Sequence, residues 1–260
     1  MEKNLKLTTN YIMLRLHKSD LYYFSVATLA ALFNVPKTKA YEILRRLKAE
    51  ELVRPVEAGK YLLLGFQPER VLSSPMFIAT RLAHPAYVSY WSALHFHGLT
   101  EQVPRTVSVA TTRKRRPLDF GEARFIFVRV APHKFFGYQR EMVGDLPVLV
   151  AEVEKALVDS LDQLRYAGGL LEVAKALRQA RERLDGKRLV AYANRMRNRS
   201  LCSRLGYLLD RFGGPVEGLD LSQAFVRLDP HQARAQGPYD HRWRVRVNVS
   251  DEELLGWRGT

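Results

Sequence analysis

Cysteine is nearly absent from the sequence, and long apolar runs are absent altogether. The 260 residues contain one cysteine, Cys202, which cannot form an intramolecular disulfide. No set of Cys and His residues has the spacing of a zinc site, so we expect no metal. No run approaches the roughly 20 apolar residues of a membrane span, and Lys3, Lys6 and Arg15 interrupt the first apolar residues in a way that signal peptides do not. These absences favour a reducing, cytoplasmic setting and no membrane partner.

Acidic residues are scarce relative to basic ones. The sequence contains 27 Asp and Glu residues and 41 Lys and Arg residues, so its formal net charge is +14 and its pI is near 10.0. Excess positive charge favours polyanionic partners, because each phosphate contact releases condensed counterions. The hydrophobic content of 47% is ordinary for a globular protein with a buried core. Nucleic acid is therefore the favoured partner, and a basic but merely solvated surface is the alternative.

The sequence pattern at residues 25–50 predicts two helices joined by a tight turn. Leu29, Ala30 and Phe33 of the first helix point toward a core, and Asn34 stands where the chain must turn, since Asn tolerates the left-handed conformation. In the second helix, apolar residues recur at i, i+3, i+4 and i+7 and form a buried stripe. This stripe consists of Ala40, Ile43, Leu44 and Leu47.

A further helix and a hairpin complete this N-terminal pattern. Residues 8–16 have helical spacing, and two short β runs at 52–56 and 60–64 flank a turn that contains Gly59. Three helices followed by a hairpin are typical of a winged helix-turn-helix. We therefore predict an α+β protein with a winged helix-turn-helix DNA-binding domain at residues 1–66. A mixed α/β C-terminal domain, rich in helices, follows at residues 67–260.

Within the second domain, strands precede helices. We expect a helix-like apolar segment at 71–82 interrupted by Pro75, a helix at 86–97, strands at 106–111, 124–130 and 142–149, and an aromatic turn at 135–138. Further helices are expected at 151–166, 170–184, 187–197 and 201–212, with a late strand at 243–249.

The second helix of the helix-turn-helix has the face that a DNA-reading helix needs. Arg facing a guanine edge is the commonest specific base contact, so Arg45, with Tyr41, is placed in the major groove. Basic residues at the helix N-terminus and in the hairpin suit phosphates. The candidate DNA contacts are Lys37, Thr38, Lys39, Tyr41, Arg45, Arg46 and, in the wing, Lys60. The alternative is a winged helix that contacts protein and has a solvated basic helix.

Four adjacent basic residues form a candidate second basic patch. They are Arg113, Lys114, Arg115 and Arg116, which follow the strand at 106–111. Such a loop suits phosphates or an acidic partner, and a solvated loop is the alternative. The last helices are also basic, which indicates either a solvated, charged outer face of a helical bundle or a continuous stripe of basic residues at helical spacing. The residues concerned are Lys187, Arg188, Arg195, Arg197, Arg199 and Arg204.

The enzyme alternative is a metal-dependent nuclease with a DNA-targeting winged helix. Its candidate groups are Asp119, Glu152, Glu154 and Lys155. The usual acid-x-Lys strand signature is missing, and Val150, Val153, Leu157 and Leu161 have helical spacing, so we expect a helix with a solvated charged face. His95 and His97 lie on different helix faces and do not ligate one metal together. No Gly-rich phosphate loop or catalytic triad is evident, so we expect no cofactor and no catalytic residues.

Several ordered blocks of the second domain resemble AbiEi-type antitoxins. Their sequences are YVSYWSAL at 87–94, HGLTEQ at 97–102, FFG at 135–137, VAEVEKALVD at 150–159, RLGYLL at 204–209, LDP at 228–230 and RWRVRVN at 242–248. With the N-terminal winged helix, the resemblance spans nearly the whole chain.

The resemblance implies the antitoxin half of an abortive-infection, type IV toxin–antitoxin pair, which acts in phage defence. Its winged helix would bind inverted repeats in the promoter as a monomer or a dimer on DNA, and would repress the operon. Its C-terminal domain would counter a nucleotidyltransferase toxin without requiring a stable complex. A stand-alone transcriptional regulator is a further alternative.

Overall fold

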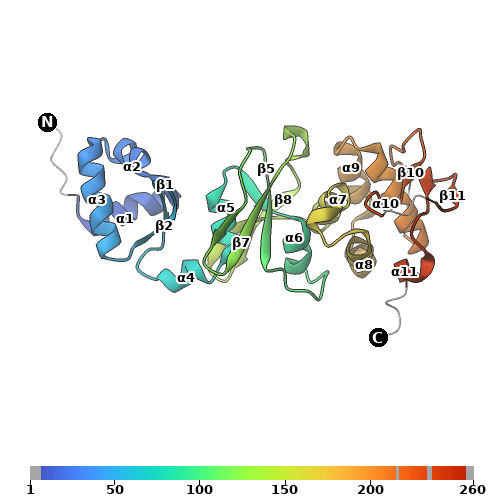
Figure 1. Cartoon of the computed structure of the whole chain (residues 1–260), viewed down its shortest axis with the longest axis horizontal. Coiled ribbons are helices and arrows are strands. Elements are labelled where there is room, and N and C mark those ends of the chain that lie inside the picture. The colour runs from blue at the N-terminus through green and yellow to red at the C-terminus, as the bar shows by residue number, and fades with distance from the viewer. Residues whose placement is uncertain (1–6, 215–216, 233–235, 256–260) are drawn as a thin grey trace.

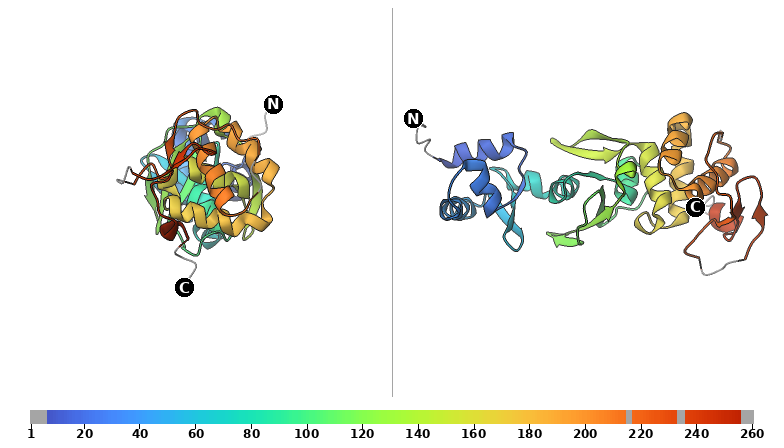
Figure 2. Two further views of the ribbon diagram at one scale, coloured as in Figure 1. Left: turned by 90° about the vertical axis from the view of Figure 1, so that its right-hand side faces the viewer. Right: turned by 90° about the horizontal axis from the view of Figure 1, so that it is seen from above.

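The computed structural model describes residues 7–214, 217–232 and 236–255. They form three parts arranged along one long axis (Figure 1). An N-terminal unit lies at one end, a six-stranded sheet lies in the middle, and a group of helices with a small sheet lies at the other end. The same order is seen from above in Figure 2. Among these residues, no helix has the length and apolar content needed to cross a bilayer.

The N-terminal unit has the element order of a winged helix-turn-helix. It comprises α1 (Thr9–Lys18), β1 (Tyr23–Ser25), α2 (Val26–Phe33), α3 (Lys37–Ala49), β2 (Val53–Glu57) and β3 (Lys60–Leu63). Its sheet has the order β1-β3-β2 with antiparallel pairs. The sequence patterns indicate every element except β1, a three-residue strand that exists through its pairing with β3 rather than through a periodicity of its own.

Local chemistry explains where these helices begin and end. The Ser25 hydroxyl accepts a hydrogen bond from the Thr28 N–H, and the Thr28 hydroxyl accepts one from the Ser25 N–H, so a capping box starts α2. Asn34 has φ 49° and ψ 52°, the left-handed conformation predicted for the turn. Ala40, Ile43, Leu44 and Leu47 of α3 are buried, which confirms the predicted apolar stripe.

The middle part is one mixed sheet in the order β6-β7-β5-β4-β9-β8. The strands are β4 (Ala86–Val88), β5 (Thr106–Thr111), β6 (Leu118–Phe120), β7 (Ala123–Arg129), β8 (Tyr138–Val143) and β9 (Leu146–Ala151). The β5–β7 and β4–β9 pairs are parallel and the others are antiparallel. Two short helices, α4 (Pro68–Leu72) and α5 (Pro75–Leu82), connect the N-terminal unit to the sheet. Pro75 begins α5, as expected of a proline at a first helical position.

The helix expected over residues 86–97 is wrong in its first part. Ala86–Val88 forms the central strand β4, and only Tyr90–Phe96 forms a helix, α6. All three residues of β4 are buried, so the strand shows no alternation of polar and apolar side chains. A short apolar run of this kind cannot be distinguished from a buried helix by periodicity.

Helices dominate the far end of the molecule. They are α7 (Val153–Asp162), α8 (Leu170–Ala180), α9 (Gly186–Arg195), α10 (Arg199–Arg211) and α11 (Asp251–Leu255). Single 3-10 turns lie at Pro132–Lys134, Leu164–Tyr166 and Arg181–Arg183. A small sheet has the order β10 (Val226–Arg227), β12 (Val245–Arg246) and β11 (Tyr239–Asp240). The late strand predicted at 243–249 is therefore only two residues long.

A close contact holds this small sheet to α10. A Cβ atom placed on Gly206 would meet the Trp243 ring at 2.1 Å, so only glycine permits the two to approach. The Trp243 indole N–H also donates to Asp210 Oδ2 at 3.1 Å. The buried apolar residues form two clusters that meet at β3, where Leu63 belongs to the N-terminal cluster and Leu62 to the larger one. The domain boundary after residue 66 stays a prediction.

The charged residues of α7 are buried, and the solvated face predicted for this helix is wrong. The exposed fractions of Glu154, Lys155 and Asp159 are 3%, 0% and 1%. The reason is tertiary, because α7 packs against α6, α8, α9, α10 and β9 and has little surface left for solvent. The sequence shows an amphipathic helix, but it does not show how many neighbours cover it.

Lys155 and Asp159 form an ion pair one helical turn apart inside this core. Asp159 Oδ2 also accepts hydrogen bonds from the Tyr87 hydroxyl at 3.0 Å and from the Ser89 hydroxyl at 2.8 Å. The Lys155 ammonium lies 4.6 Å from the centroid of the Phe136 ring. Burial lowers the pKa of Lys155 and raises the pKa of Asp159, and the attraction between the two groups opposes both shifts.

We predict that Lys155→Met lowers the free energy of unfolding by about 3–5 kcal/mol, because it leaves a buried carboxylate without its cation. The double variant Lys155→Met/Asp159→Leu is expected to lose less than Lys155→Met alone, since it removes both charges. Urea unfolding followed by circular dichroism measures both. If the double variant is less stable than Lys155→Met, the unpaired Asp159 carboxylate is not the main cause of the destabilisation by Lys155→Met.

Candidate nucleic-acid interface

Helix α3 presents most of the predicted DNA contacts on one exposed face. Lys37, Thr38, Lys39, Tyr41 and Arg45 are exposed, opposite the apolar stripe. The helix contains five basic residues and one acidic residue. It follows Pro36 and has no side-chain cap, so the N–H groups of its first turn are open to an anion. In Figures 1 and 2, α3 lies at the outer end of the molecule, away from the central sheet.

Two of the predicted α3 contacts already have partners within the protein. Lys39 forms an ion pair with Glu42 at 2.6 Å, although both side chains are about half exposed. Arg46 is only partly exposed and donates to the carbonyl oxygen of Leu7 at 2.6 Å. Arg46 therefore ties α3 to the chain before α1. Lys39 remains at the surface, where a phosphate oxygen would compete with Glu42 for its ammonium.

The wing residue Lys60 is also paired. Its ammonium donates to Glu57 Oε2 at 3.2 Å across the turn of the hairpin, and its side chain is 45% exposed. This hydrogen bond to the Glu57 carboxylate raises the pKa of Lys60 above its ordinary value. Figures 1 and 2 show that the three-stranded sheet lies on the side of the N-terminal unit that faces the central sheet.

The four residues of the candidate second basic patch do not behave alike. Arg113, Lys114 and Arg116 are exposed, and none of them forms an ion pair with any residue of the described ranges. Arg115 is only 15% exposed and binds Glu57 of the wing at 2.7 Å. The structure therefore brings this loop of the central sheet next to the wing. The sequence indicated no such proximity.

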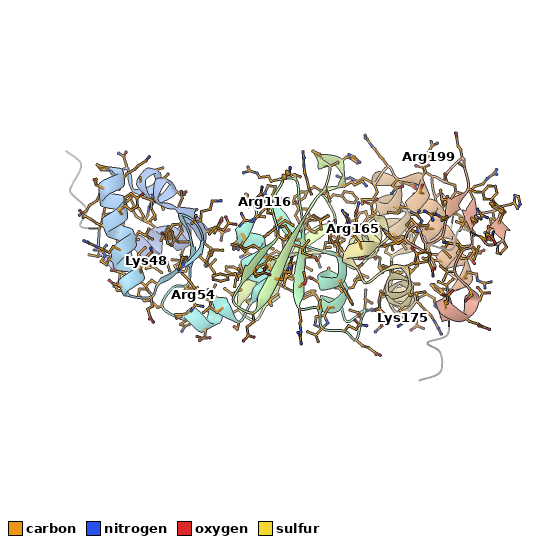
Figure 3. All side chains as sticks on the ribbon, viewed as in Figure 1. Lys48, Arg54, Arg116, Arg165, Lys175 and Arg199 are labelled. Carbon is orange, nitrogen blue, oxygen red and sulfur yellow. The ribbon has the colours of Figure 1, made fainter. Side chains whose placement is uncertain are left out.

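Positive charge alone does not mark the interface. Figure 3 labels six basic side chains, which are distributed over the whole length of the molecule. They are Lys48, Arg54, Arg116, Arg165, Lys175 and Arg199. What distinguishes α3 is the combination of an exposed basic face with an uncapped N-terminus at the end of the molecule.

Three of the six basic residues of the last helices bind groups of their own domain. Arg188 lies within 4 Å of three carboxylates, those of Glu152, Glu154 and Asp185. The Arg195 guanidinium lies 4.0 Å from the centroid of Phe136, and Arg204 donates to the carbonyl oxygen of Arg227 at 2.9 Å. Lys187, Arg197 and Arg199 are exposed. These contacts favour a charged outer face with internal links over a continuous basic stripe.

The groups considered for a nuclease do not meet at an open site. Asp119 is exposed on β6 beside Arg124, whereas Lys155 is buried with Asp159. Glu152 accepts a hydrogen bond from the Tyr192 hydroxyl at 2.7 Å, and Glu154 accepts one from the Asp185 N–H at 2.9 Å. Within the described part of the chain, no three His, Cys, Asp or Glu side chains are grouped so that they could hold a metal ion.

The two histidines near α6 have separate surroundings. His97 is partly buried, and its Nε2 donates to the carbonyl oxygen of Ala151 at 2.7 Å. His95 Nδ1 is buried and has no partner among the described residues. The polar partners that sequence patterns missed are Tyr23 and Glu57 on the wing side, and Tyr87 and Ser89 around Asp159. Each acts on a residue distant in the chain, so no local pattern marks it.

Comparisons with known proteins agree with this architecture. Residues 87–211 match the family described as the AbiEi antitoxin C-terminal domain. The crystal structure of the RV2827C protein from Mycobacterium tuberculosis is similar, with a TM-score of 0.58 at 14% sequence identity, over 96% of this chain and 94% of that chain. At this identity the likeness concerns the fold. A search of curated proteins found no match.

Proposed function

We propose that this chain, whose residues 87–211 form an AbiEi antitoxin C-terminal domain, is the antitoxin of a type IV toxin–antitoxin pair and represses its own operon. The N-terminal unit binds promoter DNA, and the C-terminal domain counters a nucleotidyltransferase toxin. The protein acts without catalysing a reaction itself. The antitoxin role follows from the family of the C-terminal domain, whereas DNA binding has separate support in the N-terminal unit.

One observation supports DNA binding most directly, and that is the exposed face of α3. The helix is held from behind by four buried apolar residues, so its outer face has a fixed orientation. Tyr41 is 60% exposed and lies one turn before Arg45, which places an aromatic hydroxyl and a guanidinium in the same groove. Lys37 and the open N–H groups of the first turn then meet the phosphate backbone.

The wing and the basic loop provide the sequence-independent part of the binding. Lys60 in the wing and Arg113, Lys114 and Arg116 in the loop are phosphate ligands in this proposal, and each neutralised phosphate makes binding more salt-dependent. Because inverted repeats present two half-sites, two protomers bind one operator, and they need to meet only on the DNA.

Arg45→Ala is expected to weaken binding to the promoter operator by about 1–3 kcal/mol and to relax the choice of base at one position, because it removes a contact to a base edge. Gel shifts on the upstream region, with single-base variants of the operator, measure both effects. Arg165→Ala is the matched control, since Arg165 is exposed and lies beyond the central sheet from α3 (Figure 3). Equal losses for the two variants would mean that α3 does not read the DNA.

Lys60→Ala is expected to weaken binding to all sequences by similar factors and to reduce the slope of log K against log salt by roughly one unit, because one phosphate contact is lost. Titrations across a series of salt concentrations measure the slope. An unchanged slope would mean that Lys60 stays with Glu57 in the complex and does not reach a phosphate.

The antitoxin role predicts that the full chain restores growth to cells that express the product of the adjacent gene. Arg45→Ala is expected to restore growth equally well while losing repression of the promoter, because the two functions lie on different domains. Colony counts and a promoter reporter measure the two outcomes in the same strains. If the adjacent gene is not toxic, or if the chain does not rescue growth, the protein is a stand-alone regulator.

A further inference from the structure

Arg115 differs from its neighbours in the basic loop because it faces the wing. Its side chain is 15% exposed, whereas Arg113, Lys114 and Arg116 point to solvent. The guanidinium lies close to two aromatic rings, 5.1 Å from the centroid of Tyr23 and 4.9 Å from that of Phe127. Tyr23 belongs to β1 and Phe127 to β7, so Arg115 is enclosed by both domains.

The partner of Arg115 is a carboxylate that several donors share. Arg115 Nη2 donates to Glu57 Oε1 at 2.7 Å and to the Tyr23 hydroxyl at 3.2 Å. The other oxygen of Glu57 accepts from the Tyr23 hydroxyl at 2.8 Å and from Lys60 at 3.2 Å. Burial alone would raise the pKa of Glu57, but the hydrogen bonds from Tyr23 and Lys60 and the charge of Arg115 outweigh it and hold the pKa below its ordinary value.

These contacts lie at the turn of the wing. Glu57 is the last residue of β2 and Lys60 the first of β3, and the two are paired across a turn of two residues. Lys60 also pairs with Ser25 of β1, so this turn closes one end of the three-stranded sheet. Arg115 adds a contact to that end of the wing from the other domain.

Separate contacts hold the two domains together near this point. The Tyr22 and Phe77 rings meet edge to face with centroids 4.8 Å apart, and Arg81 pairs with Asp20 while its guanidinium lies 4.7 Å from the Phe77 centroid. Because these contacts do not involve Arg115, its loss is expected to loosen the wing and leave the domains attached.

We propose that Arg115 is a positioning residue for DNA recognition: from the C-terminal domain it binds Glu57 and Tyr23 and holds the wing in the orientation that binds the operator. The inference rests on the proposed DNA binding by the N-terminal unit. It makes operator affinity depend on a residue that need not touch DNA. Any change in the C-terminal domain that withdraws Arg115 from Glu57 weakens repression.

The wing contact is tested on the free full-length protein by hydrogen–deuterium exchange. Arg115→Ala is expected to increase exchange several-fold at amides of residues 53–63, because the ribbon opens more often when its support is removed. Arg116→Ala is the matched control, since it removes the same charge from the same loop but no contact to Glu57, and it is expected to leave exchange in the wing unchanged. Equal exchange in Arg115→Ala and the wild-type protein would overturn the proposal.

The role in DNA recognition is tested by operator titrations with Glu57→Gln. If Glu57 anchors the wing, Glu57→Gln and Arg115→Ala each raise Kd by roughly threefold to tenfold, and the double variant is no weaker than either single variant. If Arg115 is only a phosphate ligand, removal of a negative charge near the DNA strengthens binding. Tighter binding by Glu57→Gln would therefore overturn the proposal.

The two experiments also distinguish this inference from the proposed function. If the wild-type protein does not bind its promoter, the proposed repression fails and the DNA role of Arg115 fails with it, whatever exchange shows about the wing. If the wild-type protein binds and Arg45→Ala reduces binding, but Arg115→Ala changes neither exchange nor Kd, the proposed function stands and Arg115 has no positioning role.

Discussion

The buried ion pair of Lys155 and Asp159 is the constraint on which the C-terminal domain depends. A charge without a partner costs several kcal/mol in a core, so the groups that bind this pair must be in place when the domain folds. Tyr87 and Ser89 bring the end of β4 to α7, and Phe136 covers the ammonium from the turn before β8. Polar contacts therefore fix α7 against the central sheet, and the apolar surface that α7 buries adds to them.

A second carboxylate, that of Glu57, likewise accepts hydrogen bonds from several elements, at the junction between the N-terminal unit and the central sheet. It is only partly buried, and it accepts hydrogen bonds from β1, from β3 and from a loop of the central sheet. Helix α3, at the outer end, has no comparable link to the C-terminal domain among the contacts described above. The molecule thus places α3 at its outer end and the three-stranded sheet of the wing on the side toward the central sheet (Figure 1).

Much of the fold could be predicted because local patterns suffice for amphipathic elements. The apolar stripe of α3, the turn at Asn34 and the strand at 106–111 all appear where the pattern indicates them. The errors concern fully buried segments. Strand β4 resembles a helix because all of its residues are apolar or aromatic, and α7 resembles a surface helix because its charges are spaced like solvated ones. Periodicity reports one buried face, and these segments are buried on nearly all sides.

The sequence by itself determined the helix-turn-helix, the positive charge and the residues of the α3 face, because each depends on neighbours within a few positions of the chain. Only the tertiary structure decided which basic residues are free to bind. It turned Arg115 toward Glu57, 58 residues away, while Arg116 remained at the surface. It also enclosed Lys155 in the core. The physical reason is that the cost of a charge depends on its surroundings, and residues distant in the sequence form those surroundings.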